Sequence, residues 1–177
     1  MLKRIIVLIV AWGMPCLLHA QADVTEPKSM AQVGAGFSAA NPDFGNAAVK
    51  GFSIYGSLEI AHHFGLAAEW NDWKHFTPSD VGESTYLYGL RYSRDKKRFH
   101  PYAKALFGLG SFEYEKGYYA TDSTLHFTTY VIGGGVDYTV SRRVNLRLMD
   151  LEYQFMPAFK PSGLNPFGGT VGAAYRF

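Results

Sequence analysis

Cysteine is almost absent from this 177-residue sequence, and Cys16 is its only example. Neither sign of charge is in large excess, because 17 Lys and Arg stand against 15 Asp and Glu. One cysteine cannot form an internal disulfide framework or a site with several thiolate ligands. A nearly neutral chain also lacks the basic stripe that a nucleic-acid-binding protein presents. These shortages exclude disulfide-stapled proteins, thiolate metal centres and nucleic-acid partners.

Long apolar runs are absent as well. The apolar stretch over residues 5–12 follows the basic Lys3 and Arg4 and is soon interrupted by glycine and proline. It falls well short of the roughly 20 residues that a membrane-spanning helix needs. A basic start, a short apolar core and small residues before a cleavage site are typical of a secretory signal peptide. We therefore expect a signal peptide over residues 1–20, cleaved after residue 20 or 22, and one domain over residues 21–177.

Glycine and aromatic residues are abundant. The sequence contains 19 Gly, 13 Phe, 12 Tyr and 3 Trp. Loss of the signal would remove Lys3, Arg4 and Cys16, which leaves a cysteine-free chain with 15 basic and 15 acidic residues. Many glycines and aromatics without long apolar runs are typical of a membrane β-barrel.

The end of the chain alternates in polarity. Val171, Tyr175 and Phe177 share one parity, whereas Arg176 and several small residues share the other. Successive side chains of a β-strand point to opposite faces, and a membrane strand is apolar only on its outer face. Residues 167–177 therefore read as a strand between hydrocarbon and a polar interior.

Seven further segments alternate in the same way, and each has about the length of a tilted transmembrane strand. The eight segments cover residues 31–39, 50–60, 64–76, 84–93, 102–114, 125–138, 143–155 and 167–177. Only residues 143–155 lose their phase, because the apolar Leu146 and Leu151 have opposite parity. A one-residue bulge at Leu148–Met149 would return both to the same face.

The links between these segments also alternate, between long and short. Long links are expected at 40–49, 77–83, 115–124 and 156–166, and shorter ones at 61–63, 94–101 and 139–142. Outer-membrane barrels have short periplasmic turns and long extracellular loops. An even number of strands then predicts that both termini are periplasmic.

Together these features resemble the small eight-stranded barrels of the OmpA/OmpX-like superfamily, over essentially the whole mature chain. The resemblance implies an all-β, eight-stranded antiparallel up-and-down transmembrane β-barrel preceded by a cleaved signal peptide. It also implies a monomer in the bacterial outer membrane, in contact with lipid and lipopolysaccharide. Tyr175 and Phe177 would form the signal that the barrel-assembly machinery reads. A soluble lipocalin-type barrel is the alternative, and there the apolar face would point inward.

The interior of an eight-stranded barrel is just wide enough for side chains to fill it. The phasing places five acidic and four basic residues there: Glu59, Glu69, Arg91, Lys104, Asp137, Arg147, Asp150, Glu152 and Arg176. Buried charges persist only when they are paired and hydrogen-bonded. We therefore expect a charge network that plugs the lumen. A narrow channel for small solutes is the alternative, in which the same residues would pair around water.

A structural or surface-interaction role in the cell envelope fits these expectations. Loops on a rigid scaffold commonly carry binding, and residues 115–123, with two adjacent tyrosines, are the best candidate for an extracellular ligand. The basic turn 94–98, which also contains Asp95, is either a contact for anionic headgroups or a plain periplasmic turn.

Catalysis is the remaining alternative. A membrane-embedded lipid-modifying hydrolase would need His126 beside Ser111 or Ser123 and an acid such as Glu113, and no motif joins these residues. The pair His62–His63 lies in an expected tight turn without a nearby carboxylate. We therefore expect no enzyme activity, no metal site and no cofactor.

Overall fold

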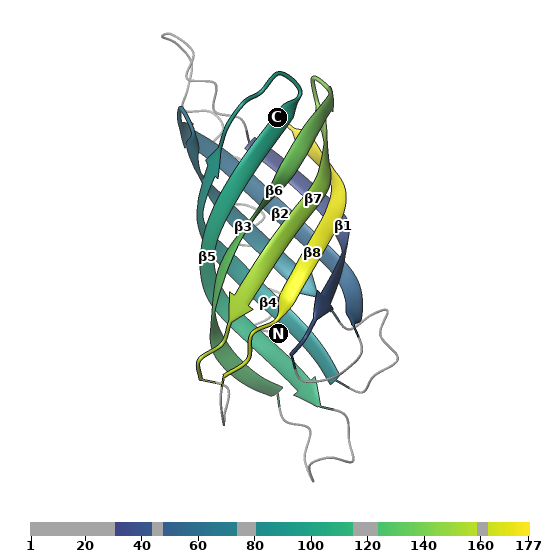
Figure 1. The fold of residues 1–177 in the computed structure, drawn as a ribbon, viewed down its shortest axis with the longest axis vertical. Helices are drawn as coiled ribbons and strands as arrows, with labels where there is room; N and C mark the ends of the chain where they lie inside the picture. The colour runs from purple at the N-terminus through teal and green to yellow at the C-terminus, as the bar shows by residue number, and fades with distance from the viewer. Residues whose placement is uncertain (1–30, 44–47, 74–80, 115–123, 159–162) are drawn as a thin grey trace, which may run out of the picture.

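The structure is a computed structural model that describes residues 31–43, 48–73, 81–114, 124–158 and 163–177. Its eight strands are β1 (Ala31–Asn41), β2 (Val49–Ala61), β3 (Phe64–Asp72), β4 (Val81–Ser93), β5 (Phe99–Tyr114), β6 (Thr124–Ser141), β7 (Val144–Phe155) and β8 (Phe167–Arg176). Each strand pairs antiparallel with the next, and β8 pairs with β1, so the sheet closes into a barrel (Figure 1). A closed barrel leaves no unpaired strand edge, which is a condition for crossing a lipid bilayer.

The predicted all-β barrel and its eight strands are confirmed, with shifts at some strand ends. β4 begins at Val81 and β5 at Phe99, each three residues earlier than expected. At β5 the prediction was wrong because the charges and Pro101 suggested a longer link. Pro101 is instead the third residue of the strand, opposite Val136 of β6. Residues 74–76, expected as part of the third strand, lie outside the described residues.

The predicted bulge in β7 is confirmed. In the pairing of β7 with β8, Arg147 lies opposite Gly172 and Asp150 lies opposite Thr170. Between these two pairs β7 therefore contains one more residue than β8. Leu148 and Met149 are both exposed, at 46% and 48%. Two consecutive side chains therefore face outward, and the parity of the strand changes between them.

Polarity is inverted relative to a water-soluble protein. The large exposed side chains on the outside are apolar or aromatic, whereas Glu69, Arg91, Lys104 and Asp150 are buried inside. In a lipocalin-type barrel the apolar side chains would line the interior, so the soluble alternative is wrong. Among the described residues, no helix is long and apolar enough to cross a membrane.

The two ends of the barrel differ. Short turns at 62–63, 94–98 and 142–143 join strands at one end, which lies at the top in Figure 1. The backbone N–H of Phe177 donates to the carbonyl of Ala31 at 2.9 Å, so both ends of the strand series lie at this turn end. The longer connections lie at the opposite, loop end. The alternation of short and long links is therefore confirmed.

Candidate functional site in the barrel lumen

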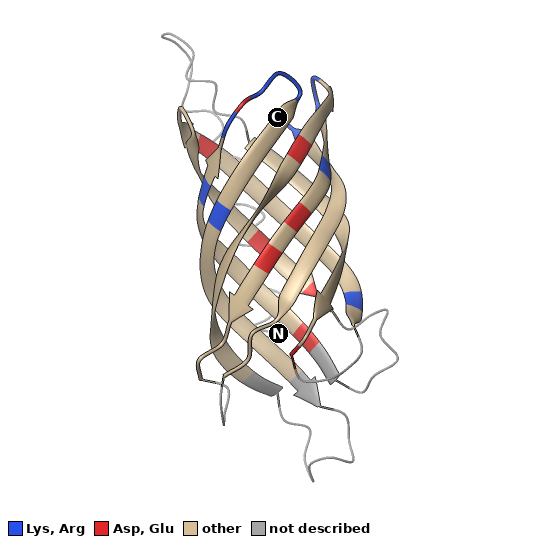
Figure 2. Cartoon of the chain, viewed as in Figure 1, with Lys and Arg blue, Asp and Glu red and all other residues tan. Residues whose placement is uncertain are grey.

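Charged residues from several strands have their side chains buried in the lumen. Figure 2 marks the positions of these residues along the strands in red and blue. Seven of the nine residues expected on the inner face are buried: Glu69, Arg91, Lys104, Asp137, Arg147, Asp150 and Glu152. The other two, Glu59 and Arg176, are half-buried near the turn end. We call the seven buried residues the charge cluster.

Lys104 lies among three carboxylates. Its Nζ atom donates to Glu69 Oε2 at 2.6 Å, to Asp150 Oδ2 at 2.8 Å and to Glu152 Oε2 at 3.1 Å. An ammonium group has three donors, so each of them is used. Because the partners come from β3 and β7, this one side chain from β5 connects opposite walls of the barrel.

Arg147 connects the same carboxylates to Asp137. Its Nη1 atom donates to Asp150 Oδ2 at 2.7 Å and to Glu69 Oε1 at 3.2 Å, and its Nε atom lies 3.5 Å from Asp137 Oδ1. The guanidinium carbon is 3.4 Å from the ring centroid of Tyr55. A cation over an aromatic face gains a further electrostatic attraction.

Arg91 continues the cluster toward the turn end. It donates to Asp137 Oδ2 at 2.8 Å and lies 3.8 Å above the ring centroid of Tyr102. Gln32 donates to the same carboxylate oxygen at 3.1 Å and accepts from Asn145 at 2.9 Å. Neutral amides from β1 and β7 therefore close the network around the cations.

The two half-buried residues form hydrogen bonds with neutral side chains. Arg176 donates to Thr139 Oγ1 at 3.2 Å, and the hydroxyl of Ser93 donates to Glu59 at 2.9 Å. These residues lie beside a cavity of about 20 Å³ that His100 and Asp95 also line. A space of that size holds about one water molecule.

Glycines make room for the charged side chains. Gly133 is the register partner of both Lys104 and Glu152, and a Cβ atom there would lie 3.0 Å from Lys104 Cε. Gly135 lies opposite Asp150, and its Cβ atom would lie 2.8 Å from the Tyr102 hydroxyl. The inner face therefore places a large charged residue against a residue without a side chain.

Sequence reasoning missed Glu83, which it placed in a loop. Glu83 belongs to β4, is 2% exposed, and neither carboxylate oxygen has a hydrogen-bond partner within the described part of the chain. The nearby carboxylate of Glu152 repels a negative charge on Glu83. The missed signal was parity, because Glu83 continues the inner-face alternation of Thr85 and Arg91.

Two amides that were given no role also contact the charge cluster. Asn71 and Gln154 both donate to Glu152 Oε1, at 3.2 and 2.9 Å. Farther toward the loop end the lumen becomes apolar, where Phe112, Met156 and Leu164 pack together in the interior. The lumen is thus occupied by side chains from its charged middle to this apolar layer.

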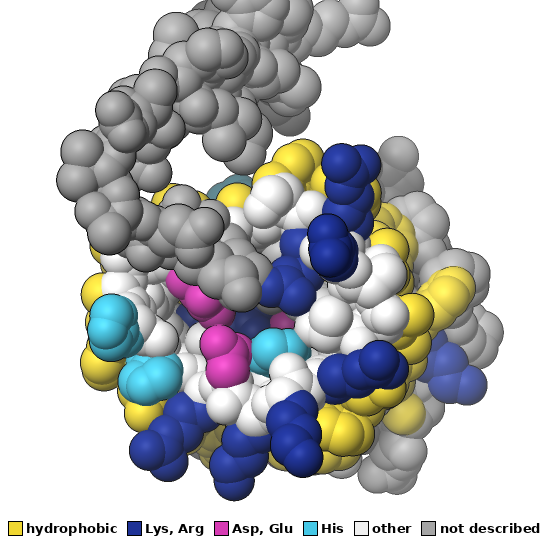
Figure 3. All heavy atoms as spheres, turned by 90° about the horizontal axis from the view of Figure 1, so that it is seen from above, with side chains coloured by type: hydrophobic (Ala, Val, Ile, Leu, Met, Phe, Trp, Pro, Cys, Tyr) yellow, Lys and Arg dark blue, Asp and Glu magenta, His cyan; other side chains and the backbone are white. Residues whose placement is uncertain are grey.

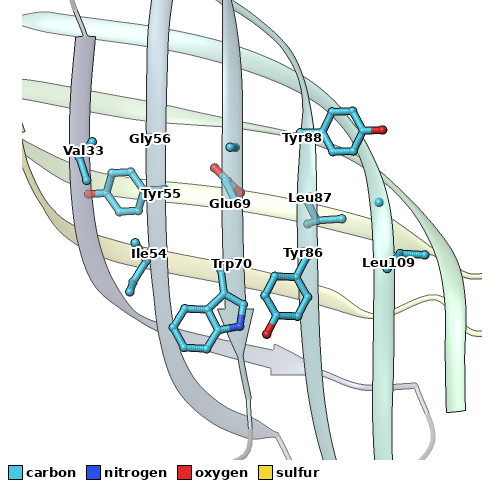
Figure 4. A pocket seen from close by; sticks show the side chains of 12 residues that line it. Val33, Ile54, Tyr55, Gly56, Glu69, Trp70, Tyr86, Leu87, Tyr88 and Leu109 are labelled. Carbon is cyan, nitrogen blue, oxygen red and sulfur yellow. The ribbon is translucent and has the colours of Figure 1, made fainter. Parts of the chain in front are cut away.

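The outer wall carries a wide apolar depression of about 550 Å³, shown in Figure 4. Trp70 and Tyr86 stack beside it with ring centroids 6.1 Å apart, and Ile54 and Leu109 complete its rim. Its lining is almost entirely apolar and it faces outward, as expected for a surface that contacts hydrocarbon.

The residues considered for catalysis are only partly described. Ser111 and His126 are register partners across β5 and β6, and the Ser111 hydroxyl donates to the carbonyl of Ser84 at 3.4 Å. Ser123 and the side chain of Glu113 lie outside the described residues, as does the candidate loop 115–123.

The histidine pair lies in the turn between β2 and β3, where both side chains are exposed. His63 packs against the ring of Tyr92, with centroids 5.7 Å apart. Throughout the described ranges, no group of three His, Cys, Asp or Glu side chains is arranged to hold a metal ion.

A closed antiparallel barrel with an apolar exterior and a charged interior is a transmembrane β-barrel. Residues 8–177 match the family described as outer membrane protein beta-barrel domain, and the chain belongs to this family. The predicted resemblance to outer-membrane barrels is therefore confirmed, and the family assigns the protein to the bacterial outer membrane. No curated protein sequence matches the chain.

Several solved barrels have the same fold. Neisserial surface protein A is 20% identical, with a TM-score of 0.65 over 84% of this chain and 96% of that one. OprG from Pseudomonas aeruginosa is 13% identical, with a TM-score of 0.56 over 84% and 96%. Ail, the attachment invasion locus protein of Yersinia pestis, is 17% identical, with a TM-score of 0.53 over 84% and 99%.

Proposed function

We propose that the protein is a non-conducting outer-membrane barrel with a structural or surface-interaction role in the cell envelope. One observation carries this proposal: Lys104 and Arg147 are 5% and 4% exposed and bind carboxylates of β3 and β7 across the lumen. A solute would have to separate these pairs, which leaves buried charges without partners at a cost of several kcal/mol. The charge cluster therefore acts as a plug.

The proposed topology has the turn end in the periplasm and the long connections outside the cell. Residues 1–20 are proposed to be a signal peptide that directs the domain 21–177 to the envelope as a monomer. Tyr175 and Phe177 are proposed to be read by the barrel-assembly machinery. Their rings are in edge contact, 5.0 Å apart, and both are exposed at the end of β8, which supports that role.

The proposed partners are membrane lipid, lipopolysaccharide and an extracellular ligand at the loop end. Ail and neisserial surface protein A are described as an attachment invasion locus protein and a surface protein. Their likeness to this chain is one of fold, so the ligand is proposed from the rigid barrel that would present the loops. We propose that the protein has no catalytic activity.

Single-channel recording in a planar lipid bilayer tests the plug. The mature protein is refolded in detergent, and its fold is verified by the shift in gel mobility between heated and unheated samples. We expect no discrete conductance steps. Steps that change in size in Lys104→Ala or Glu152→Ala would instead mean that the charge cluster lines a pore.

A narrow channel is the second candidate, favoured by the imbalance of the buried charges. The charge cluster has four carboxylates and three cations, and Glu83 adds a carboxylate without a cationic partner in the described part of the chain. A pore with this lining would prefer cations. In a salt gradient its reversal potential would be shifted toward the equilibrium potential of the cation. The variant Glu83→Gln would reduce this shift.

A further inference from the structure

Two turns at the turn end carry exposed cations that do not belong to the charge cluster. Six residues form this basic rim: Arg94, Lys96, Lys97, Arg98, Arg142 and Arg143. All six are exposed, and none forms an ion pair with another described residue. They come from two separate turns, β4–β5 and β6–β7, which lie at the same end of the barrel. Both turns therefore contribute positive charge to this end.

The two acidic residues described at this end, Asp95 and Glu59, already have partners, although the side chain of Asp95 is 62% exposed. Asp95, in the middle of the first turn, contacts His100 Nδ1 at 2.5 Å. Glu59 faces the lumen and accepts a hydrogen bond from Ser93. Figure 3 views the barrel from the turn end: most of the dark blue side chains lie along its margin, and the magenta ones lie nearer the centre. The positive charge of the basic rim is therefore directed toward the surroundings of the barrel.

The larger turn is an ordered platform. The backbone N–H of Lys96 donates to the carbonyl of Phe99 at 2.8 Å, and the reverse bond is 3.0 Å. Arg98 accepts from the backbone of Thr139 in β6 at 2.8 Å, which ties the turn to the neighbouring strand. Lys97 adopts a φ of 59°, a conformation that permits this tight turn. Side chains on a fixed backbone lose less freedom when they bind a ligand.

The basic rim lies next to a ring of outward-facing aromatic residues. Phe99 follows Arg98 directly and packs on Tyr138 with centroids 5.0 Å apart. Tyr92, two residues before Arg94, packs on Phe64 with centroids 5.1 Å apart. Aromatic belts mark the level of the lipid headgroups. Long Lys and Arg side chains beside such a belt keep their apolar stems on lipid and their charges among the headgroups.

We propose that the basic rim binds the headgroups of anionic phospholipids, of the phosphatidylglycerol class, in the leaflet at the turn end. Arginine binds phosphate through two parallel hydrogen bonds, and clustered basic residues beside a membrane segment attract anionic lipid. The site requires only a bilayer around the barrel, so it is independent of whether the lumen conducts.

Native mass spectrometry of the folded mature protein tests the proposal. The protein, in a neutral detergent at low salt, is offered phosphatidylglycerol and phosphatidylcholine with identical acyl chains. We expect wild type to retain phosphatidylglycerol in preference. Each basic residue near the headgroups contributes roughly a fivefold gain in affinity. The triple variant K96Q/K97Q/R98Q should therefore lose affinity by on the order of 100-fold.

Two control variants separate the basic rim from general charge. K96R/K97R keeps the charge and should keep the preference, whereas K50Q removes one charge at the loop end and should leave the preference unchanged. All variants lie in exposed positions and are first verified by the gel shift. Equal retention of both lipids by wild type, or undiminished phosphatidylglycerol in the triple variant, would overturn the proposal. The single variant K96Q removes one charge, as K50Q does, so equal losses of phosphatidylglycerol in these two variants would overturn it as well.

Discussion

Lys104→Met removes the cation on which three buried carboxylates depend. Glu69, Asp150 and Glu152 all lie within 3.1 Å of Lys104 Nζ, and their side chains are 1–3% exposed. Methionine has a similar length but cannot donate a hydrogen bond. Arg147 still contacts Glu69 and Asp150, whereas Glu152 keeps only its two amide donors. Removing one partner of a buried ion pair typically lowers the free energy of unfolding by about 3–5 kcal/mol, and we expect a loss of this size in Lys104→Met.

The free energy of unfolding can be measured by urea titration of the protein in lipid vesicles, followed by the fluorescence of Trp70 and Trp73. The matched control is Glu59→Gln, because Glu59 is only half-buried and its partner is a neutral hydroxyl. We expect the control to lose less than about 1 kcal/mol. The double variant Lys104→Met/Glu152→Gln should recover part of the loss, since it removes one uncompensated charge.

A loss below about 1 kcal/mol in Lys104→Met, with the gel shift retained, would refute this reasoning. It would mean that water enters the lumen and screens the three carboxylates. The plug would then be weak, and the channel hypothesis would gain support from a measurement that is independent of conductance.

Three further outcomes are expected. Glu83→Gln should raise the free energy of unfolding by about 1 kcal/mol in the same titration, because it removes the cost of burying a carboxylate that no described residue hydrogen-bonds and also its repulsion from Glu152; a decrease would contradict this. Gly133→Ala should lower it by about 1–3 kcal/mol, since the new Cβ would lie 2.5 Å from the Leu151 carbonyl oxygen; unchanged stability would show that the strand yields. Deletion of Phe177 should reduce the folded barrel in cell membranes but not refolding in detergent, and an equal loss in both would argue against an assembly signal.

Most of the strand pattern could be predicted because a lipid exterior imposes strict alternation on every strand. The bulge at Leu148–Met149 could be inferred for the same reason, since without it Asp150 and Glu152 would face hydrocarbon. The partners of each charge could not be inferred. Lys104 reaches carboxylates on β3 and β7 across the lumen, and that choice depends on barrel closure and the register of every pair.

Glu83 escaped prediction for a different reason. The residues before it, Thr77-Pro78-Ser79-Asp80, are typical of a loop, and the strand was expected to start only at Ser84. A boundary error of three residues is harmless for the fold. For the site it is not, because it concealed a buried carboxylate. Alternation extended past an expected strand end would have identified it.

The bulge in β7 also determines how this strand can change length. Side chains of a strand alternate between its two faces, so a shift by one residue exchanges the faces. A single insertion or deletion elsewhere in β7 would therefore move the lumen residues that follow it to the lipid face. At Leu148–Met149 the chain already contains one odd step, and both side chains lie outside. When barrels that share only 13–20% identity with this chain are aligned to it, a one-residue gap in β7 therefore belongs at this position.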